Sequence, residues 1–150
     1  RELRIRKQQE ALKTKSFKAL KGQLPWPADG RIIAKFGRQW NSKLKTTTEN
    51  PGIDIKGQPG SPIRTVLGGV VTTITYIRGY GTTIIVDHGG GFYTVYSHVT
   101  NIQTVVDGQV RNGDIIAYMG DSGSINGSKL HFEIWGKGQK LDPEKWLIKK

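Results

Sequence analysis

The sequence contains no cysteine, which excludes disulfide bonds and thiolate metal sites. It also lacks any run of about 18 apolar residues, so we expect no segment to span a membrane. No signal peptide is recognisable, and the chain opens with Arg1 rather than methionine, so we expect it to be a piece of a longer protein. Its 150 residues suit one domain with one core.

Acidic residues are also scarce. The chain has 12 Asp and Glu against 23 Lys and Arg, a net charge of +11. Such a surface is drawn to polyanions such as nucleic acid, anionic lipid or an anionic cell wall. The basic residues are not interleaved with aromatics in a nucleic-acid-binding motif, so no nucleic-acid partner is predicted. The plainest interpretation of the charge is a solvated surface.

The first 22 residues differ in composition from the rest. They are rich in Lys, Arg, Gln, Glu, Leu and Ala, which favour helix, and they contain no proline. Gly22 is placed to end such a helix, with Pro25 and Pro27 just beyond it. We predict a short basic helix over residues 1–22, consistent with the end of an upstream coiled coil, followed by one domain over residues 23–150.

From Leu24 onward the sequence favours short strands and tight turns. The predicted strand regions are residues 68–81, residues 82–99 (two strands joined through the glycines at 89–91), residues 114–120 and residues 129–139. Strands this close together, with no helix between them, require antiparallel pairing. We therefore predict an all-β fold, an antiparallel sandwich or partly open barrel. Residues 142–150 predict a final helical turn capped by Asp142.

Three histidines, His88, His98 and His131, fall in strand-like segments. A histidine in a strand is more often a packed or surface residue than a metal ligand. Side chains alternate between the two faces of a strand, so His131 shares one face with Lys129 and Glu133. His131 is therefore predicted to point with a polar set.

The same alternation places His98 on one face with Tyr96 and Thr94. Asp54 follows a Pro-Gly turn and is flanked by isoleucines, as if held in place. Two polar-face histidines and a turn-anchored aspartate are the ingredients of a zinc site, although composition alone is a weak signal.

Several ordered motifs carry a family resemblance: "NPGIDI", "GYGTTIIVDHGGGFYTVYSHV", "VRNGDIIAYMGDSG" and "KLHFEIW". Together they resemble the LytM/lysostaphin family of zinc-dependent peptidoglycan endopeptidases, from about Leu24 to Trp146. The resemblance implies a β-rich domain of the duplicated-hybrid-motif type, with a groove across an antiparallel sheet. It also implies three motifs: His-x-Gly-x-Asp, Tyr-x-His and His-x-His. In that family the first His, the Asp and the final His bind zinc, and the other two histidines assist catalysis.

This chain departs from the family at two of those positions. Asn50 stands at a zinc-binding histidine and Lys129 at a catalytic histidine, whereas Asp54, His98 and His131 remain. Catalytic zinc needs about three protein ligands and one open position for water. Asn50 offers a neutral amide oxygen, and the Lys129 ammonium repels a metal and cannot accept a proton at neutral pH unless its pKa is strongly lowered. We therefore expect neither catalysis nor a bound cofactor.

The groove itself is expected to remain as a binding surface. Its predicted lining is Asn50, Asp54, Tyr80, Tyr96, His98, Lys129 and His131. In place of a metal, the two histidines with Asp54 and Lys129 would form a hydrogen-bonded ion-pair cluster, or merely satisfy one another as leftovers. Trp26, Trp40 and Trp146 are assigned to packing.

Family members with a degenerate zinc site resemble the murein hydrolase activators, which carry a coiled coil ahead of the domain and bind cell-wall amidases. The leading prediction is a noncatalytic domain of the periplasmic or extracellular bacterial envelope that activates a peptidoglycan hydrolase (an amidase) in wall remodelling or cell division, with peptidoglycan as a further partner. One alternative is an active zinc endopeptidase in which Glu49 or Glu133 replaces a missing ligand. Another is a passive module that holds anionic wall polymers by charge.

Overall fold

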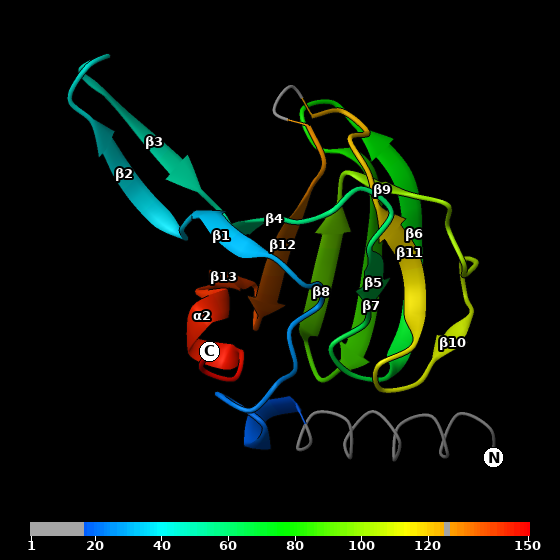
Figure 1. Ribbon diagram of the computed structural model, residues 1–150. Coiled ribbons are helices and arrows are strands. Elements are labelled where there is room, and N and C mark those ends of the chain that lie inside the picture. The colour runs from blue at the N-terminus through cyan, green and yellow to red at the C-terminus, as the bar shows by residue number, and fades with distance from the viewer. Residues whose placement is uncertain (1–16, 125–126) are drawn as a thin grey trace, which may run out of the picture.

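The computed structural model describes residues 17–124 and 127–150. Its main sheet has eight strands in the order β1-β4-β12-β8-β7-β6-β10, with β13 paired to β12 outside that path (Figure 1). The strands are β1 (Arg31–Ala34), β4 (Ile53–Lys56), β6 (Gly69–Ile77), β7 (Gly81–Gly89), β8 (Phe92–Ser97), β10 (Gln109–Val110), β12 (Lys129–Gly136) and β13 (Gln139–Leu141). Every strand pair in this sheet is antiparallel, as predicted.

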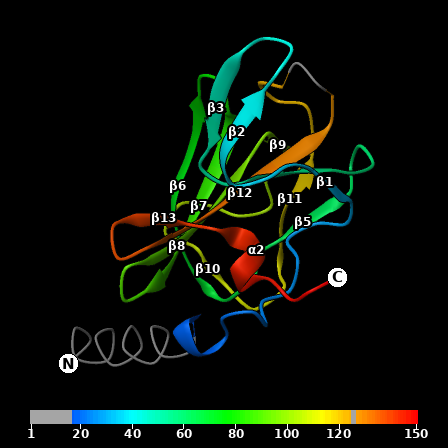
Figure 2. The same cartoon turned by 90° about the vertical axis from the view of Figure 1, so that its left-hand side faces the viewer.

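A smaller sheet of three strands packs against this one. It consists of β5 (Pro62–Arg64), β11 (Ile115–Met119) and β9 (Val99–Thr100), in the order β5-β11-β9. Side chains from both sheets meet in one core, where Ile63 and Ile116 are as fully buried as Ile84 and Phe132. Figure 2 shows the two sheets lying side by side without closing into a barrel. The predicted antiparallel all-β fold is therefore confirmed, in its open form.

A third element, a two-stranded hairpin, projects away from both sheets (Figures 1 and 2). It is formed by β2 (Gly37–Asn41) and β3 (Thr46–Asn50), and its side chains are almost all exposed. Trp40 is 64% exposed, so its assignment to packing is wrong. The hairpin was not foreseen because its polar side chains show no alternation with apolar ones.

The two ends of the described chain pack together. Residues 17–19 are helical, and Gly22 follows with a φ of 81°, a conformation that glycine adopts without strain. The rest of the predicted helix over residues 1–22 lies outside the described residues. Phe17 is fully buried, stacks on Phe92 at 4.8 Å and lies 5.3 Å from the ring of Trp146. Phe17 therefore belongs to the core of the domain, and Trp146 packs as predicted.

The final helical turn forms where the sequence places it. Helix α2 spans Pro143–Trp146, and the carboxylate of Asp142 accepts a hydrogen bond from the backbone N–H of Glu144 at 3.0 Å. Trp26 is partly buried against the core and donates its indole N–H to the carbonyl of Ile148 at 2.7 Å. Within residues 17–124 and 127–150, no helix is long and apolar enough to cross a membrane.

Candidate functional site

One row of polar side chains crosses four adjacent strands of the main sheet. Asp54 on β4 lies opposite His131 on β12, His131 lies opposite Ser97 on β8, and Ser97 lies opposite Thr83 on β7. Residues paired across antiparallel strands share a face. The alternate residues of β12, such as Phe132, point into the core instead. The sheet therefore presents a polar face opposite its apolar one.

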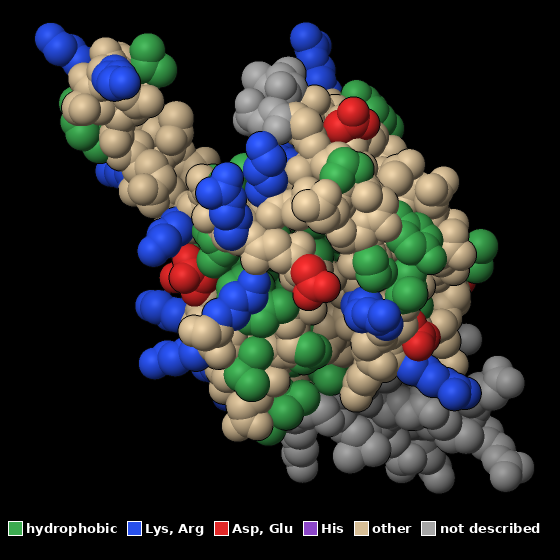
Figure 3. Space-filling model, viewed as in Figure 1, with side chains coloured by type: hydrophobic (Ala, Val, Ile, Leu, Met, Phe, Trp, Pro, Cys, Tyr) green, Lys and Arg blue, Asp and Glu red, His purple; other side chains and the backbone are tan. Residues whose placement is uncertain are grey.

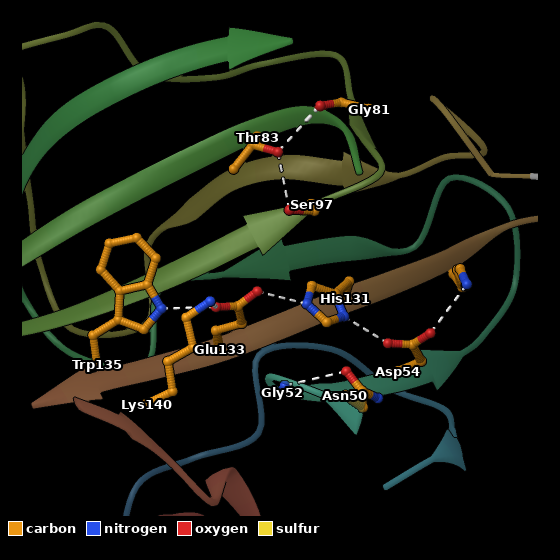
Figure 4. Close-up of polar contacts among 11 residues, drawn as sticks. Asn50, Gly52, Asp54, Gly81, Thr83, Ser97, His131, Glu133, Trp135 and Lys140 are labelled. Atoms are coloured by element: carbon orange, nitrogen blue, oxygen red, sulfur yellow. Dashed lines mark hydrogen bonds and ion pairs between the residues drawn. The ribbon is translucent and has the colours of Figure 1, made fainter. Parts of the chain in front are cut away.

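Four charged side chains on this face form what we call the ion-pair chain: Lys129, Asp54, His131 and Glu133. The ammonium of Lys129 lies 3.0 Å from Oδ2 of Asp54, and Nδ1 of His131 lies 2.6 Å from Oδ1 of the same carboxylate. The other ring nitrogen, Nε2 of His131, lies 2.7 Å from Oε2 of Glu133 (Figure 4). Trp135 donates its indole N–H to Oε1 of Glu133 at 2.7 Å, and the exposed ammonium of Lys140 lies 3.7 Å from the same oxygen. The predicted common face of Lys129, His131 and Glu133 is therefore confirmed.

Burial and neighbouring charges shift the pKa values of three members of this chain, His131, Asp54 and Glu133. Burial alone would lower the pKa of His131, but hydrogen bonds with Asp54 and Glu133 outweigh it and raise that pKa. Burial alone would raise the pKa of Asp54 and of Glu133, but in each case the contact with His131 holds the pKa below its usual value. Both ring nitrogens of His131 face carboxylate oxygens, which accept hydrogen bonds, so the geometry favours an imidazolium held between two carboxylates.

This arrangement does not fit a catalytic zinc ion. A zinc-binding histidine must offer a lone pair on neutral imidazole. Both ring nitrogens of His131 instead donate protons to carboxylate oxygens, and Lys129 holds the other oxygen of Asp54. Asn50 turns its amide oxygen to the backbone N–H of Gly52 at 3.2 Å, where it stabilises the turn before β4. No group of three or more His, Asp or Glu placed to hold a metal occurs among the described residues.

His98 occupies a different position from the predicted one. It lies between β8 and β9, not in a strand, and has a φ of 65°, so alternation does not extend to it. Its Nδ1 donates to the carbonyl of Ser122 at 2.7 Å, and within the part of the chain that the structure describes no hydrogen bond joins His98 to the ion-pair chain. Burial lowers the pKa of His98, and the charge of Lys129 lowers it further. The expectation that His98 joins the cluster by hydrogen bonding is therefore wrong.

The loop that holds His98 is fixed by a close backbone contact. Gly81 has a φ of 69°, and a Cβ atom there would lie 1.9 Å from the carbonyl oxygen of Ser122. The hydroxyl of Ser122 in turn accepts from the backbone N–H of Thr82 at 3.0 Å. These contacts clamp the loop around Ser122 onto the start of β7 and so set the position of the His98 ring.

The two tyrosines predicted to line the groove behave differently. Tyr96 is fully buried, and its hydroxyl accepts from the backbone N–H of Val66 at 3.1 Å and from the Thr94 hydroxyl at 2.8 Å. Tyr96 is a core residue, so its placement in the groove is corrected. Tyr80 stands over the ion-pair chain, with its ring centroid 5.0 Å from that of His131. Burial, followed by the charges of Glu133 and Asp54, raises the pKa of Tyr80.

Sequence reasoning gave Glu133 no place in the ion-pair cluster and Trp135 no partner. Alternation places Glu133 on the polar face, and the endopeptidase alternative uses it as a replacement metal ligand, whereas the structure shows it as the second anion that holds His131. The available signal was the spacing: residues 129, 131, 133 and 135 share one face of β12. Because Glu133 lies two residues from His131 on that face, its carboxylate is within hydrogen-bonding reach of the His131 ring.

The site lies in a two-sheet antiparallel domain, where Asp54 and His131 face each other on adjacent strands. The chain belongs to peptidase family M23, whose sequence pattern matches residues 48–143.

Two relatives show the extent of the similarity. The chain is 31% identical over 135 residues to murein hydrolase activator EnvC of Escherichia coli, covering 90% of this chain and 31% of that protein. It is 36% identical over 123 residues to murein hydrolase activator NlpD of Salmonella typhimurium, covering 81% of this chain and 30% of that one. The chain therefore spans about a third of the length of these relatives.

A solved structure supports the fold alone. The crystal structure of a zinc-containing peptidase from Vibrio cholerae aligns with a TM-score of 0.75 at 22% identity, over 86% of this chain and 41% of that one.

Proposed function

We propose that this domain is a noncatalytic activator that binds a peptidoglycan hydrolase and switches it on. The observation that carries the proposal is the closed ion-pair chain, in which His131 donates from both ring nitrogens and Asp54 is bound by Lys129. Such a site has no lone pair on His131 to offer a metal, and Lys129 stands in place of one of the two histidines that assist catalysis in the family. The similarity to EnvC and NlpD, both named murein hydrolase activators, supports the same role.

The partner is proposed to contact the polar face of the main sheet. Asn50, Asp54, Tyr80 and Lys129 are partly exposed there, whereas His98 and His131 are buried. Lys129 already neutralises Asp54, so it offers the partner a weaker charge than a free lysine would. We propose that Tyr80 makes the main contact with the partner. The two buried histidines would hold the neighbouring side chains of the polar face in position.

The proposed partner is a cell-wall amidase, acting in wall remodelling or cell division. The proposed location is the bacterial envelope, in the periplasm or outside the cell. The net charge of +11 would hold the domain close to anionic wall polymers, so peptidoglycan is a second proposed contact.

Dye release from labelled sacculi tests the proposal. The full chain alone should release no dye, a purified amidase of the same bacterium should release dye slowly, and the two together should release it faster. Zinc-dependent release by the chain alone would show an endopeptidase instead. Sedimentation of the chain with sacculi, without any effect on amidases, would show a passive wall-binding module.

A further inference from the structure

The projecting hairpin exposes two large apolar side chains. We call residues 37–50 the hairpin arm; within it Trp40 is 64% exposed and Leu44 is 70% exposed. Among the described elements, the most extensive contacts of β2 and β3 are with each other. Figure 3 shows hydrophobic and basic side chains together at the tip of the arm, clear of the body. Apolar side chains gathered on a projecting element, as at the tip of the arm in Figure 3, are a feature of interaction surfaces.

The arm has a defined turn although its side chains do not pack into a core. None of its side chains is buried, and an isolated two-stranded hairpin is only marginally stable in water. Its turn is nevertheless fixed, because Oδ1 of Asn41 accepts from the backbone N–H groups of Lys43 and Leu44 at 3.0 and 3.1 Å. A preformed turn lowers the entropy lost on binding. A partner that covers the arm would therefore stabilise it at little conformational cost.

The charge of the arm indicates which kind of partner covers it. Three basic residues, Arg38, Lys43 and Lys45, stand against one acidic residue, Glu49, a net charge of +2. A second copy of this chain would be repelled, because each copy carries +11. A glycan could stack the C–H face of a sugar on Trp40, but it offers no apolar pocket for an aliphatic side chain such as Leu44. An acidic protein surface with an apolar pocket matches both the charges and the apolar pair.

The arm is also joined directly to the candidate site. Strand β3 ends at Asn50, and β4 begins at Ile53, next to Asp54. One protein bound to the polar face of the main sheet can therefore contact the arm at the same time.

We propose that the hairpin arm docks into an apolar, acid-rimmed pocket on the murein hydrolase, with Trp40 as the anchor. Lys43 and Lys45 pair with carboxylates at the rim of that pocket. Tryptophan is enriched among the residues that dominate binding energy, and rim charges mainly speed association. This inference rests on the proposed function and adds to it a second contact, outside the polar face.

Binding measurements on the full chain test the arm. The probes are the purified murein amidases of the source bacterium, each titrated singly by calorimetry. Trp40→Ala should weaken binding at least tenfold and Leu44→Ser at least threefold. The matched controls Tyr76→Ala and Val105→Ser, at residues 66% and 67% exposed elsewhere on the surface, should change it less than twofold.

A charge reversal and a mapping experiment extend the test. Lys43→Glu with Lys45→Glu should slow association at low salt at least fivefold, while Lys149→Glu with Lys150→Glu should slow it far less. Hydrogen exchange on the wild-type complex should show new protection of the amides of residues 37–50. Absence of that protection overturns the inference even if a substituted arm fails to fold.

The outcomes separate the two proposals. If the wild-type chain binds and activates an amidase and Trp40→Ala does so equally well, the arm inference fails and the proposed function stands. If Trp40→Ala reduces only sedimentation with sacculi, or only self-association, the occupant is the wall or a second copy and the inference is overturned. If the wild-type chain binds no amidase, both proposals fall together.

Discussion

Lys129 and Asp54, on neighbouring strands β12 and β4, form an ion pair of 3.0 Å at the position where the family resemblance implies a metal site. Both side chains are largely shielded, with 13% and 14% of their surface exposed. An ammonium is therefore held where a divalent cation would otherwise meet the carboxylate. Removing one member of so shielded a pair leaves the other uncompensated, which is costly.

The first prediction concerns restoration of a metal site. Asn50→His with Lys129→His should bind zinc, because the ammonium is gone and Nδ1 of His131 faces Asp54, where it can exchange its proton for the metal. Glu133 would remain on Nε2–H of His131, the arrangement that orients histidine ligands in zinc sites. Zinc content after dialysis measures this. Asn50→His alone is the control and should stay metal-free, and a folded double variant without zinc would contradict the assignment of these positions.

The second prediction is a pH dependence of stability. His131 has a pKa raised above the ordinary 6.5, so its stabilisation is complete below about pH 6.5 and is lost as pH rises through the raised value. The pKa values of Asp54 and Glu133 lie below 3.8 and 4.5, so their stabilisation is present above those values and is lost as pH falls through the lowered ones. The contribution of the ion-pair chain to stability should therefore be largest between about pH 5 and pH 6.5.

Urea unfolding from pH 4 to pH 9 measures this profile. His131→Gln should remove the loss on the alkaline side. His98→Gln is the control and should keep it, because the pKa of His98 is lowered and its effect has the opposite sign. If the stability of His131→Gln still falls at alkaline pH as in the wild type, the interpretation of His131 as a charged imidazolium between two carboxylates would be wrong.

The third prediction isolates Glu133. Glu133→Gln keeps the shape of the side chain but removes the anion that balances His131 and accepts from Trp135. The free energy of unfolding at pH 6 should fall by about 1.5–3 kcal/mol, the usual range for hydrogen bonds to charged groups. Glu144→Gln, at an exposed position on α2, should change it by about 0.5 kcal/mol or less. Equal losses in the two variants would mean that Glu133 is not part of the stabilising chain.

The fourth prediction concerns recognition by Tyr80. Tyr80→Ala should reduce amidase activation about tenfold or more, since a partly exposed aromatic at the centre of an interface commonly contributes 2 kcal/mol or more. Among the described residues the Tyr80 ring contacts that of His131, and its backbone hydrogen bonds do not depend on the side chain, so the unfolding free energy should change much less than in Glu133→Gln. Tyr76→Ala, at a residue 66% exposed on β6, serves as the control for activation. If Tyr80→Ala activates the amidase fully, the polar face is not the partner's main contact.

Much of the sheet could be predicted because local signals agree there. Glycines mark the turn between β7 and β8, and alternation along β12 assigns Lys129, His131 and Glu133 to one face. Along β8 the same reasoning misleads, because polar Thr94 points into the core and is satisfied there by hydrogen bonds. Polarity is a guide to the exposed face only where no buried partner is available.

Other features depend on information that a sequence pattern does not carry. His98 leaves the pleat through a positive φ, which is rare outside glycine and is held in place by the distant loop at Ser122. The strands of the hairpin arm bury no side chains, so they lack the alternation of apolar and polar residues that would identify them as strands. The sequence shows that His131 and Glu133 share a face. Predicting their hydrogen bond also requires the orientation of the His131 ring, which the sequence does not give.

The salt bridge between Lys129 and Asp54 also has an evolutionary consequence. A histidine at position 50 alone would face an aspartate already bound by an ammonium, and a histidine at position 129 alone would leave the metal one ligand short. Neither single substitution would complete a metal site. Metal binding would therefore require both changes together, and a single step toward it would give selection nothing to act on.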